Sequence, residues 1–70
     1  MNAVQINEQF TDREFEIISL MAEGASAKEI ANHLFVSINT VTTHRKNILG
    51  KTTAPNTTAL VAKCIRLGWI

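Results

Sequence analysis

Hydrophobic residues recur along most of the chain at the three-to-four-residue spacing of amphipathic helices, with short polar segments between them. The first predicted helix begins after Thr11, because the segment 11–14, Thr-Asp-Arg-Glu, is a capping box whose end side chains hydrogen-bond each other's backbone N–H. Phe10 and Phe15 stand at the spacing of a hydrophobic staple. Gly24 is placed to end this helix in a left-handed cap. The apolar face comprises Phe15, Ile18 and Ala22, broadened by Ile17, Leu20 and Met21.

Two more helix starts follow closely, and their spacing predicts a helix-turn-helix. The segment 26–29, Ser-Ala-Lys-Glu, is a second capping box, and its helix ends near Phe35. Ser37 begins a third helix, with Val36 and Val41 at staple spacing. About two residues join these helices, as in motifs where a tight turn sets two helices at about 90–120°. The inward residues of the second helix are Ile30, Ala31 and Leu34.

The third predicted helix runs from Ile38 to about Lys51 and contains a β-branched segment, 40–43, that favours a strand on propensity alone. We nevertheless predict a helix, because at ~100° per residue the apolar residues of this segment fall on one side. These residues are Ile38, Val41, Ile48 and Leu49. Residues 52–58 predict a loop, and Asn56 or Thr57 caps a fourth helix that Gly68 closes. We therefore expect an all-α fold: a four-helix bundle around a central helix-turn-helix.

Length and composition limit the classes of function. With 70 residues and 46% hydrophobic content, the chain makes one small soluble domain, placed at 10–70, with 1–9 as a flexible segment or linker. No run approaches the ~18 apolar residues of a membrane span, and the start is not a signal peptide, so we expect a cytoplasmic protein. Cys64 is the single cysteine, and no Cys/His cluster offers a metal site. We expect no cofactor.

The distribution of charge says more than the net charge of +1. All six acids and two cations lie in residues 1–29, whereas residues 30–70 hold five cations and no acid. Such asymmetry suggests a basic face for an anionic partner, most commonly nucleic acid. Five solvated cations pointing in several directions remain the alternative interpretation.

The third helix carries a face suited to reading DNA. With Val41 toward the core, the opposite face carries Asn39, Thr42, Thr43, Lys46, Asn47 and Gly50. Side chains that read bases in the major groove are Lys or Arg, Asn or Gln, and Ser or Thr. An ordinary solvated face is the alternative, but such faces usually mix Glu with Lys. We therefore favour groove binding.

At these motifs the chain resembles the DNA-binding domain of the LuxR/NarL (FixJ, GerE-type) bacterial transcription regulators. The resemblance covers residues 10–70. It is carried by Phe10-Thr11-Asp12-Arg13-Glu14, Ile17-Ile18-x-Leu20, Gly24-x-Ser26-x-Lys28-Glu29-Ile30-Ala31, Leu34-x-Val36-Ser37 and Thr40-Val41-x-x-His44-x-x-Asn47-Ile48.

The resemblance implies that the third helix lies in the major groove and that the fourth often mediates dimerisation. By position, it makes Thr42, Thr43 and Lys46 base-facing, alongside Asn39 and Asn47 from the face described above. It places Lys28, Ser37 and Thr40 against phosphates near helix N-termini. We place His44 and Arg45 on the phosphate side. For His44, packing is an equal interpretation and base reading is a secondary one.

The chain departs from the family after Lys51, where Leu-Gly-Val-x-Asn-Arg is common. Residues 52–57, Thr-Thr-Ala-Pro-Asn-Thr, stand there instead. The missing leucine is expected to weaken a core contact, and the missing arginine removes a cation that the family often uses near the fourth helix.

The fourth helix has an apolar surface broader than packing within one small domain requires. The excess predicts an interface, either in a homodimer or with an upstream receiver or ligand-binding domain. The residues assigned to it are Leu60, Val61, Ala62 and Ile65. A tolerated surface alanine at position 62 is the plainer interpretation of part of this surface.

An enzyme is not expected, because His33, His44 and Cys64 fall on three different helices without a matching acid. The predicted function is sequence-specific binding of double-stranded DNA as the effector domain of a bacterial transcription regulator. We expect it to read the major groove as a dimer and to have RNA polymerase as a further partner. Two alternatives remain. The helix-turn-helix of a sigma factor's region four shares the Lys-Glu-Ile-Ala and Thr-Val signals, whereas a protein-interaction module would use the fourth helix alone.

Overall fold

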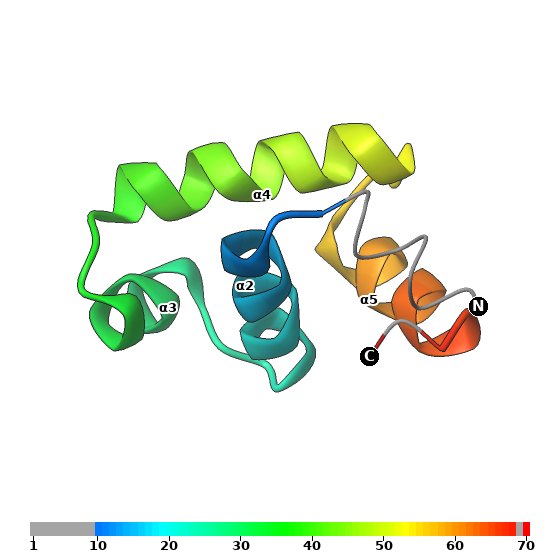
Figure 1. The fold of residues 1–70 in the computed structure, drawn as a ribbon, viewed down its shortest axis with the longest axis horizontal. Helices are drawn as coiled ribbons and strands as arrows, with labels where there is room; N and C mark the ends of the chain where they lie inside the picture. Colours follow the sequence, from blue (N-terminus) through cyan, green and yellow to red (C-terminus); the bar gives the residue numbers. More distant parts are fainter. Residues whose placement is uncertain (1–9, 69) are drawn as a thin grey trace.

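The computed structural model describes residues 10–68 and 70, and over this range the chain forms α-helices and no strand. The helices are α2 (Asp12–Ala22), α3 (Ala27–Leu34), α4 (Ile38–Thr52) and α5 (Thr57–Arg66). The longest helix, α4, runs along one side of the molecule, and α2, α3 and α5 lie beneath it (Figure 1). The all-α prediction is confirmed, while the predicted linker 1–9 lies outside the described residues.

Each helix begins where its cap was predicted. The Thr11 hydroxyl accepts from the Glu14 N–H at 3.1 Å, and the Glu14 carboxylate accepts from the Thr11 N–H at 2.9 Å. Ser26 and Glu29 make the same reciprocal pair at 3.1 and 2.8 Å. Asn56, rather than Thr57, caps α5 by accepting from the Ala59 N–H at 2.8 Å. These bonds fix the starts of the helices because they satisfy otherwise unpaired N–H groups.

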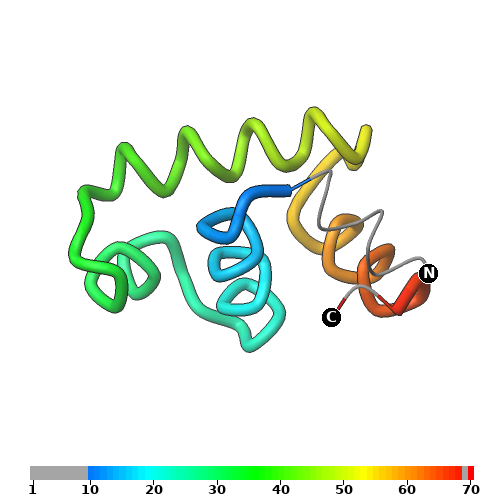
Figure 2. The backbone as a smooth tube through the Cα atoms, viewed as in Figure 1, coloured from blue at the N-terminus to red at the C-terminus, as the bar shows by residue number. Residues whose placement is uncertain are grey.

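The turn of the helix-turn-helix joins α3 to α4 through three residues, 35–37. Phe35 ends α3 in the left-handed conformation, at φ 59°. The Val36 N–H returns to the Ala31 carbonyl at 3.0 Å, and the Ser37 hydroxyl accepts from the Thr40 N–H at 3.1 Å to start α4. The tube in Figure 2 follows this short reversal from α3 into α4. The turn therefore brings α3 beneath the N-terminal half of α4.

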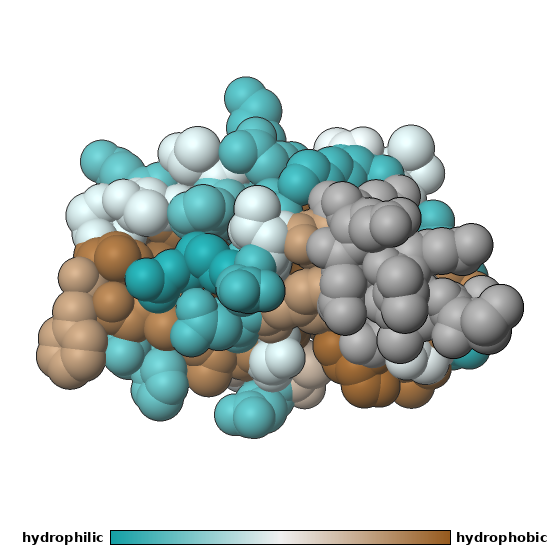
Figure 3. Space-filling model, in the orientation of Figure 1, coloured by the Kyte–Doolittle hydropathy of each residue, from teal (hydrophilic) through white to brown (hydrophobic). Residues whose placement is uncertain are grey.

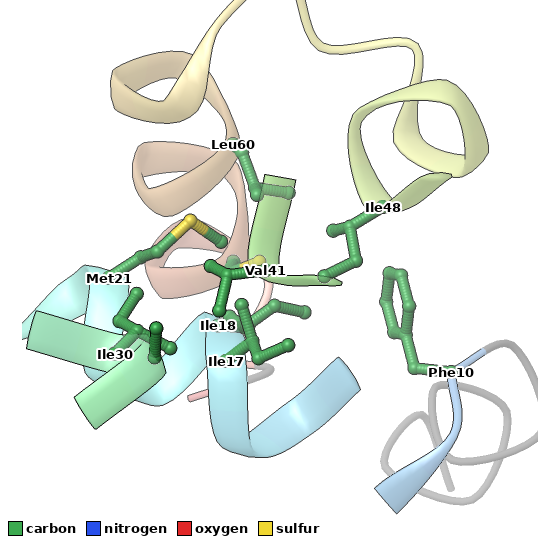
Figure 4. Close-up of a cluster of buried hydrophobic side chains, with 10 residues drawn as sticks. Phe10, Ile17, Ile18, Met21, Ile30, Val41, Ile48 and Leu60 are labelled. Atoms are coloured by element: carbon green, nitrogen blue, oxygen red, sulfur yellow. The ribbon is translucent and has the colours of Figure 1, made fainter. Parts of the chain in front are cut away.

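A single core holds the four helices together, and α2 contacts each of the other three. Figure 4 shows side chains from all four helices and from Phe10 meeting there. The buried apolar residues are Phe10, Ile17, Ile18, Met21, Ile30, Ala31, Val41, Ile48, Leu60 and Cys64. Every described helix contributes to this core, so the position of α4 depends on packing against the whole domain.

Two residues predicted to face the core are exposed. Ala22 lies in the last turn of α2, at the edge of its buried face, and is exposed. Ile38 lies in the first turn of α4 with 49% of its surface exposed. Both stand at helix ends, where the neighbouring helices no longer cover the border of the buried stripe.

The predicted loop 52–58 is wrong at both ends. Thr52 belongs to α4 and is buried, and its hydroxyl donates to the carbonyls of Ile48 and Leu49 at 3.1 and 3.2 Å. Thr57 and Thr58 belong to α5. The connection is therefore only residues 53–56, and the threonine in place of the family leucine is buried with its hydroxyl satisfied.

None of the helices in the described part of the chain has the length and apolar character needed to span a membrane.

Candidate nucleic-acid interface

The outer face of α4 carries the polar side chains that we predict to face bases, and all of them are exposed. They are Asn39, Thr42, Thr43, Lys46 and Asn47. The inner face of the same helix buries Val41, Ile48 and Thr52, which fixes which way the outer face points. Over α4 the molecular surface is hydrophilic (Figure 3). We call these five residues the base-facing set.

The predicted phosphate contacts are spread around this face rather than gathered at one place. Ser37 and Thr40 lie at the start of α4, where their hydroxyl oxygens are 2.9 Å apart. By helical spacing, His44 and Arg45 lie on opposite flanks of α4, and both are half-buried. Lys28 is exposed on the first turn of α3. The predicted phosphate contacts therefore come from the start of α4, from two adjacent positions near its buried face and from α3.

An ion pair between a buried carboxylate and a partly exposed lysine fixes the C-terminal end of α4 to the start of α2. The Lys51 Nζ lies 2.7 Å from Glu14 Oε1, and Glu14 keeps only 4% of its surface exposed. The same ammonium lies 5.7 Å from the centre of the Phe10 ring, within the range of a cation–π contact. Phe10 in turn meets Phe15 edge to face at 5.6 Å, so the predicted staple forms. Sequence reasoning assigned Glu14 to capping alone and missed this pair, because 37 residues separate the partners.

The surroundings of Glu14 set its ionisation. Burial works to raise the pKa of this carboxyl, but hydrogen bonds from Lys51 and the Thr11 N–H, together with the Lys51 charge, hold it below its usual value. At neutral pH Glu14 is therefore ionised, and the ion pair is present when the domain is folded.

The cations divide into those that hold the fold and those that face outward. Lys51 binds Glu14, and Lys63 donates to the Thr52 carbonyl at 3.0 Å, closing the C-terminal end of α4. Within the described part of the chain, no ion pair engages Lys28, Arg45 or Lys46. These three cations lie on the helix-turn-helix and are available to an anionic partner.

The interface predicted on α5 needs a correction. Leu60 is fully buried in the domain core and presents no free surface, whereas Val61 is half-buried against that core. Ala62 is exposed, and Ile65 is 60% exposed. Leu67 and Ile70, which were left out of the predicted interface, are 44% and 42% exposed. The apolar surface therefore lies toward the end of the chain, because the i and i+4 positions 60 and 64 face inward.

Cys64 is buried, as expected of a small hydrophobic residue. Burial raises the pKa of its thiol, and the nearby Lys63 charge offsets this only in part. The thiol is therefore protonated and unreactive at neutral pH.

A basic, hydrogen-bonding face on the second helix of a helix-turn-helix defines a DNA-binding module. The family model for bacterial regulatory proteins of the luxR family (GerE) matches residues 8–64. The chain belongs to this family, and it is a DNA-binding domain of LuxR/NarL-type transcription regulators rather than an enzyme.

Several bacterial regulators are similar in sequence to this chain. The chain is 45% identical over 60 residues to the Uncharacterized response regulatory protein YgeK of Escherichia coli (strain K12), covering 86% of this chain and 41% of that protein. It is 53% identical over 45 residues to the Transcriptional regulatory protein LiaR of Bacillus subtilis (strain 168), covering 64% and 21%. It is 47% identical over 47 residues to the Response regulator protein VraR of Staphylococcus aureus, covering 67% and 22%.

The chain spans less than half the length of these relatives. Membership of the luxR family supports the predicted regulator over the alternative of a sigma factor's region four.

Proposed function

We propose that the domain recognises a specific sequence in double-stranded DNA by placing α4 in the major groove. The observation that carries this proposal is the exposed outer face of α4, where the base-facing set includes amides, hydroxyls and one lysine but no acid. An α-helix fits the major groove of B-DNA, which presents a distinct donor and acceptor pattern for each base pair. An acid on this face would repel phosphates, so the absence of acids from the base-facing set supports the proposal.

Each member of the base-facing set matches a kind of base contact. Asn39 and Asn47 can pair with adenine through both donor and acceptor atoms, and Lys46 can donate to guanine. Thr42 and Thr43 offer a hydroxyl to polar base edges and a methyl group to thymine. The proposed phosphate contacts, from Lys28, Ser37, Thr40, His44 and Arg45, fix the orientation of the helix and carry no sequence information.

Substitution of Lys46 tests this assignment. We expect Lys46→Ala to weaken binding to a preferred duplex by about 5- to 150-fold, the equivalent of ~1–3 kcal/mol, and to relax the base preference at one position. Arg66→Ala is the matched control, because it removes an exposed cation from α5. Binding is measured by fluorescence anisotropy at several salt concentrations. An equal loss on preferred and random duplexes would reassign Lys46 to a phosphate contact.

We propose further that the domain binds DNA as a homodimer through the exposed end of α5. Ile65, Leu67 and Ile70 are large apolar residues with 42–60% of their surfaces exposed. With few unpaired cations, one copy holds DNA weakly, whereas two copies can read half-sites one helical turn apart.

The relatives named as response regulators support a role as the effector end of a longer bacterial regulator. On this proposal an upstream receiver or ligand-binding domain controls the domain in the cytoplasm, and RNA polymerase is a partner at the promoter.

A further inference from the structure

A groove of about 430 Å³ runs beside the C-terminal half of α4, between this helix and the connection to α5. Its polar wall belongs to α4 and is formed by Thr42, Arg45 and Lys46. Its apolar lining, which we call the apolar wall, comes from Leu49 on the same side of α4 and from Ala54 and Pro55 in the connection. We call it the α4–α5 groove.

The α4–α5 groove exists because of the way that α4 ends. Thr53 adopts a left-handed backbone, at φ 54°, which turns the chain back along the helix. The Ala54 N–H then donates to the Leu49 carbonyl at 3.1 Å and holds the connection beside α4. Ala54 and Pro55 stand where the chain departs from the usual family sequence.

The charge of the α4–α5 groove is one-sided. Arg45 and Lys46 line it, none of the lining residues is an acid, and neither cation is in an ion pair with another described residue. A cationic rim above an apolar wall fits a ligand with an anionic group next to a hydrophobic ring. One deoxyribose with its phosphodiester has both features.

The location identifies the source of such a ligand. Thr42 and Lys46 belong both to the groove and to the base-facing set, so the groove continues the surface that faces DNA. The walls of the major groove are the two sugar-phosphate backbones, and about half of protein–DNA hydrogen bonds go to them. With α4 in the major groove, one backbone strand borders the flank that carries Arg45.

We propose that the α4–α5 groove binds one sugar-phosphate unit of the DNA strand that borders α4. Arg45 donates to the phosphate oxygens, and the apolar wall packs against the deoxyribose. Arg45 thereby supplies a cation near the start of α5, where the family arginine is replaced by Thr57. This inference rests on the proposed function, because it needs α4 in the major groove.

A charge placed in the groove tests the proposal. Pro55→Asp puts a carboxylate on the exposed apolar wall, and we expect it to weaken binding to the preferred duplex by about tenfold or more, because like charges are brought together. The control Ser19→Asp adds the same charge at an exposed position on α2, outside the groove. Thermal unfolding verifies that both variants fold. Equal losses for the two variants would show a general effect of charge and overturn the proposal.

A second experiment identifies the phosphate and does not depend on Pro55. Duplexes with one neutral methylphosphonate at successive positions are bound to the wild type and to Arg45→Gln. We expect one position at which neutralisation weakens wild-type binding and has no further effect on Arg45→Gln, since the two changes remove the same contact. If the affinity losses from the methylphosphonate and from Arg45→Gln multiplied at every position, the two changes would act independently and the proposal would be overturned. If the wild type prefers no sequence, the proposed function fails as well, whereas specific binding without this coupling rejects the groove alone.

Discussion

Thr53 has the backbone conformation least suited to its side chain. Its φ of 54° lies in the left-handed region, which a β-branched residue adopts only at a cost of about 1 kcal/mol or more. Its hydroxyl donates to the Thr52 carbonyl at 2.6 Å, which offsets part of this cost. The family's usual glycine has no such penalty at this place.

We expect Thr53→Gly to increase the free energy of unfolding by roughly 0.5–1 kcal/mol, because glycine adopts this conformation without strain. Thr58→Gly is the control, since it places glycine in the first turn of α5 and should lower stability by roughly a few tenths of a kcal/mol. Urea denaturation followed by circular dichroism measures both. Destabilisation by Thr53→Gly would show that the hydroxyl bond outweighs the strain.

Glu14 makes the stability of the fold depend on pH. Its pKa in the folded domain is below the ordinary value of 4.5, so its contribution is complete above that pH and is lost as the pH falls through the folded value. The pKa of Glu29 is lowered too, by the hydrogen bonds from Ser26. Acid should therefore lower the stability of the domain by breaking the hydrogen bonds of both carboxylates.

We expect Glu14→Gln to destabilise the domain at pH 7 and to flatten the loss of stability below pH 4.5. Neutralising the buried carboxylate removes the charge that pairs with the Lys51 ammonium at 2.7 Å. Glu29→Gln alters an exposed capping box, so it should change the loss of stability in acid less than Glu14→Gln does. Denaturation midpoints between pH 3 and 7 provide the comparison. If the stability of Glu14→Gln fell below pH 4.5 as steeply as that of the wild type, the pH dependence would belong to other groups.

At the scale of elements, local hydrogen-bonding chemistry made the helices predictable. All four starts could be read from caps because the cap partners are only three residues apart. The β-branched segment 40–43 is helical because Val41 and Ile48 pack into the core and overrule strand propensity. The α4–α5 connection was mispredicted because a threonine-rich segment looks like a loop. Nothing local reveals that the Thr52 hydroxyl binds the Ile48 carbonyl.

In the candidate site, too, the sequence predicts features that depend on neighbouring residues and misses contacts between distant ones. The base-facing set follows from helical spacing alone, since it lies opposite Val41. The Glu14–Lys51 pair and the α4–α5 groove both join distant parts of the chain, so helical spacing within one segment could not reveal them.

The proposed dimer is tested on α5. Ile65→Asp places a charge on a residue that is 60% exposed, so we expect the folded monomer to remain and self-association to be lost. Sedimentation equilibrium measures the monomer–dimer balance, with Ser19→Asp as the charge-matched control on α2. Affinity for a duplex with two half-sites should fall, while affinity for one half-site should hold. Unchanged self-association in Ile65→Asp would exclude this surface.

For the whole molecule, the distribution of charge explains how a chain of net charge +1 binds a polyanion. Two acids are used in capping boxes, and Glu14 also neutralises Lys51. Lys28, Arg45 and Lys46 remain on the helix-turn-helix, so the positive charge that matters is local. Binding should therefore weaken with salt along a shallow slope for one copy and a steeper one for two.

Selection from a random pool of duplexes tests the central claim, which is that the outer face of α4 reads base sequence. The account predicts that the wild-type domain enriches a short motif, and that Lys46→Ala enriches a motif with relaxed preference at one base pair. Binding without enrichment of any motif would contradict it, because contacts to phosphates alone carry no sequence information.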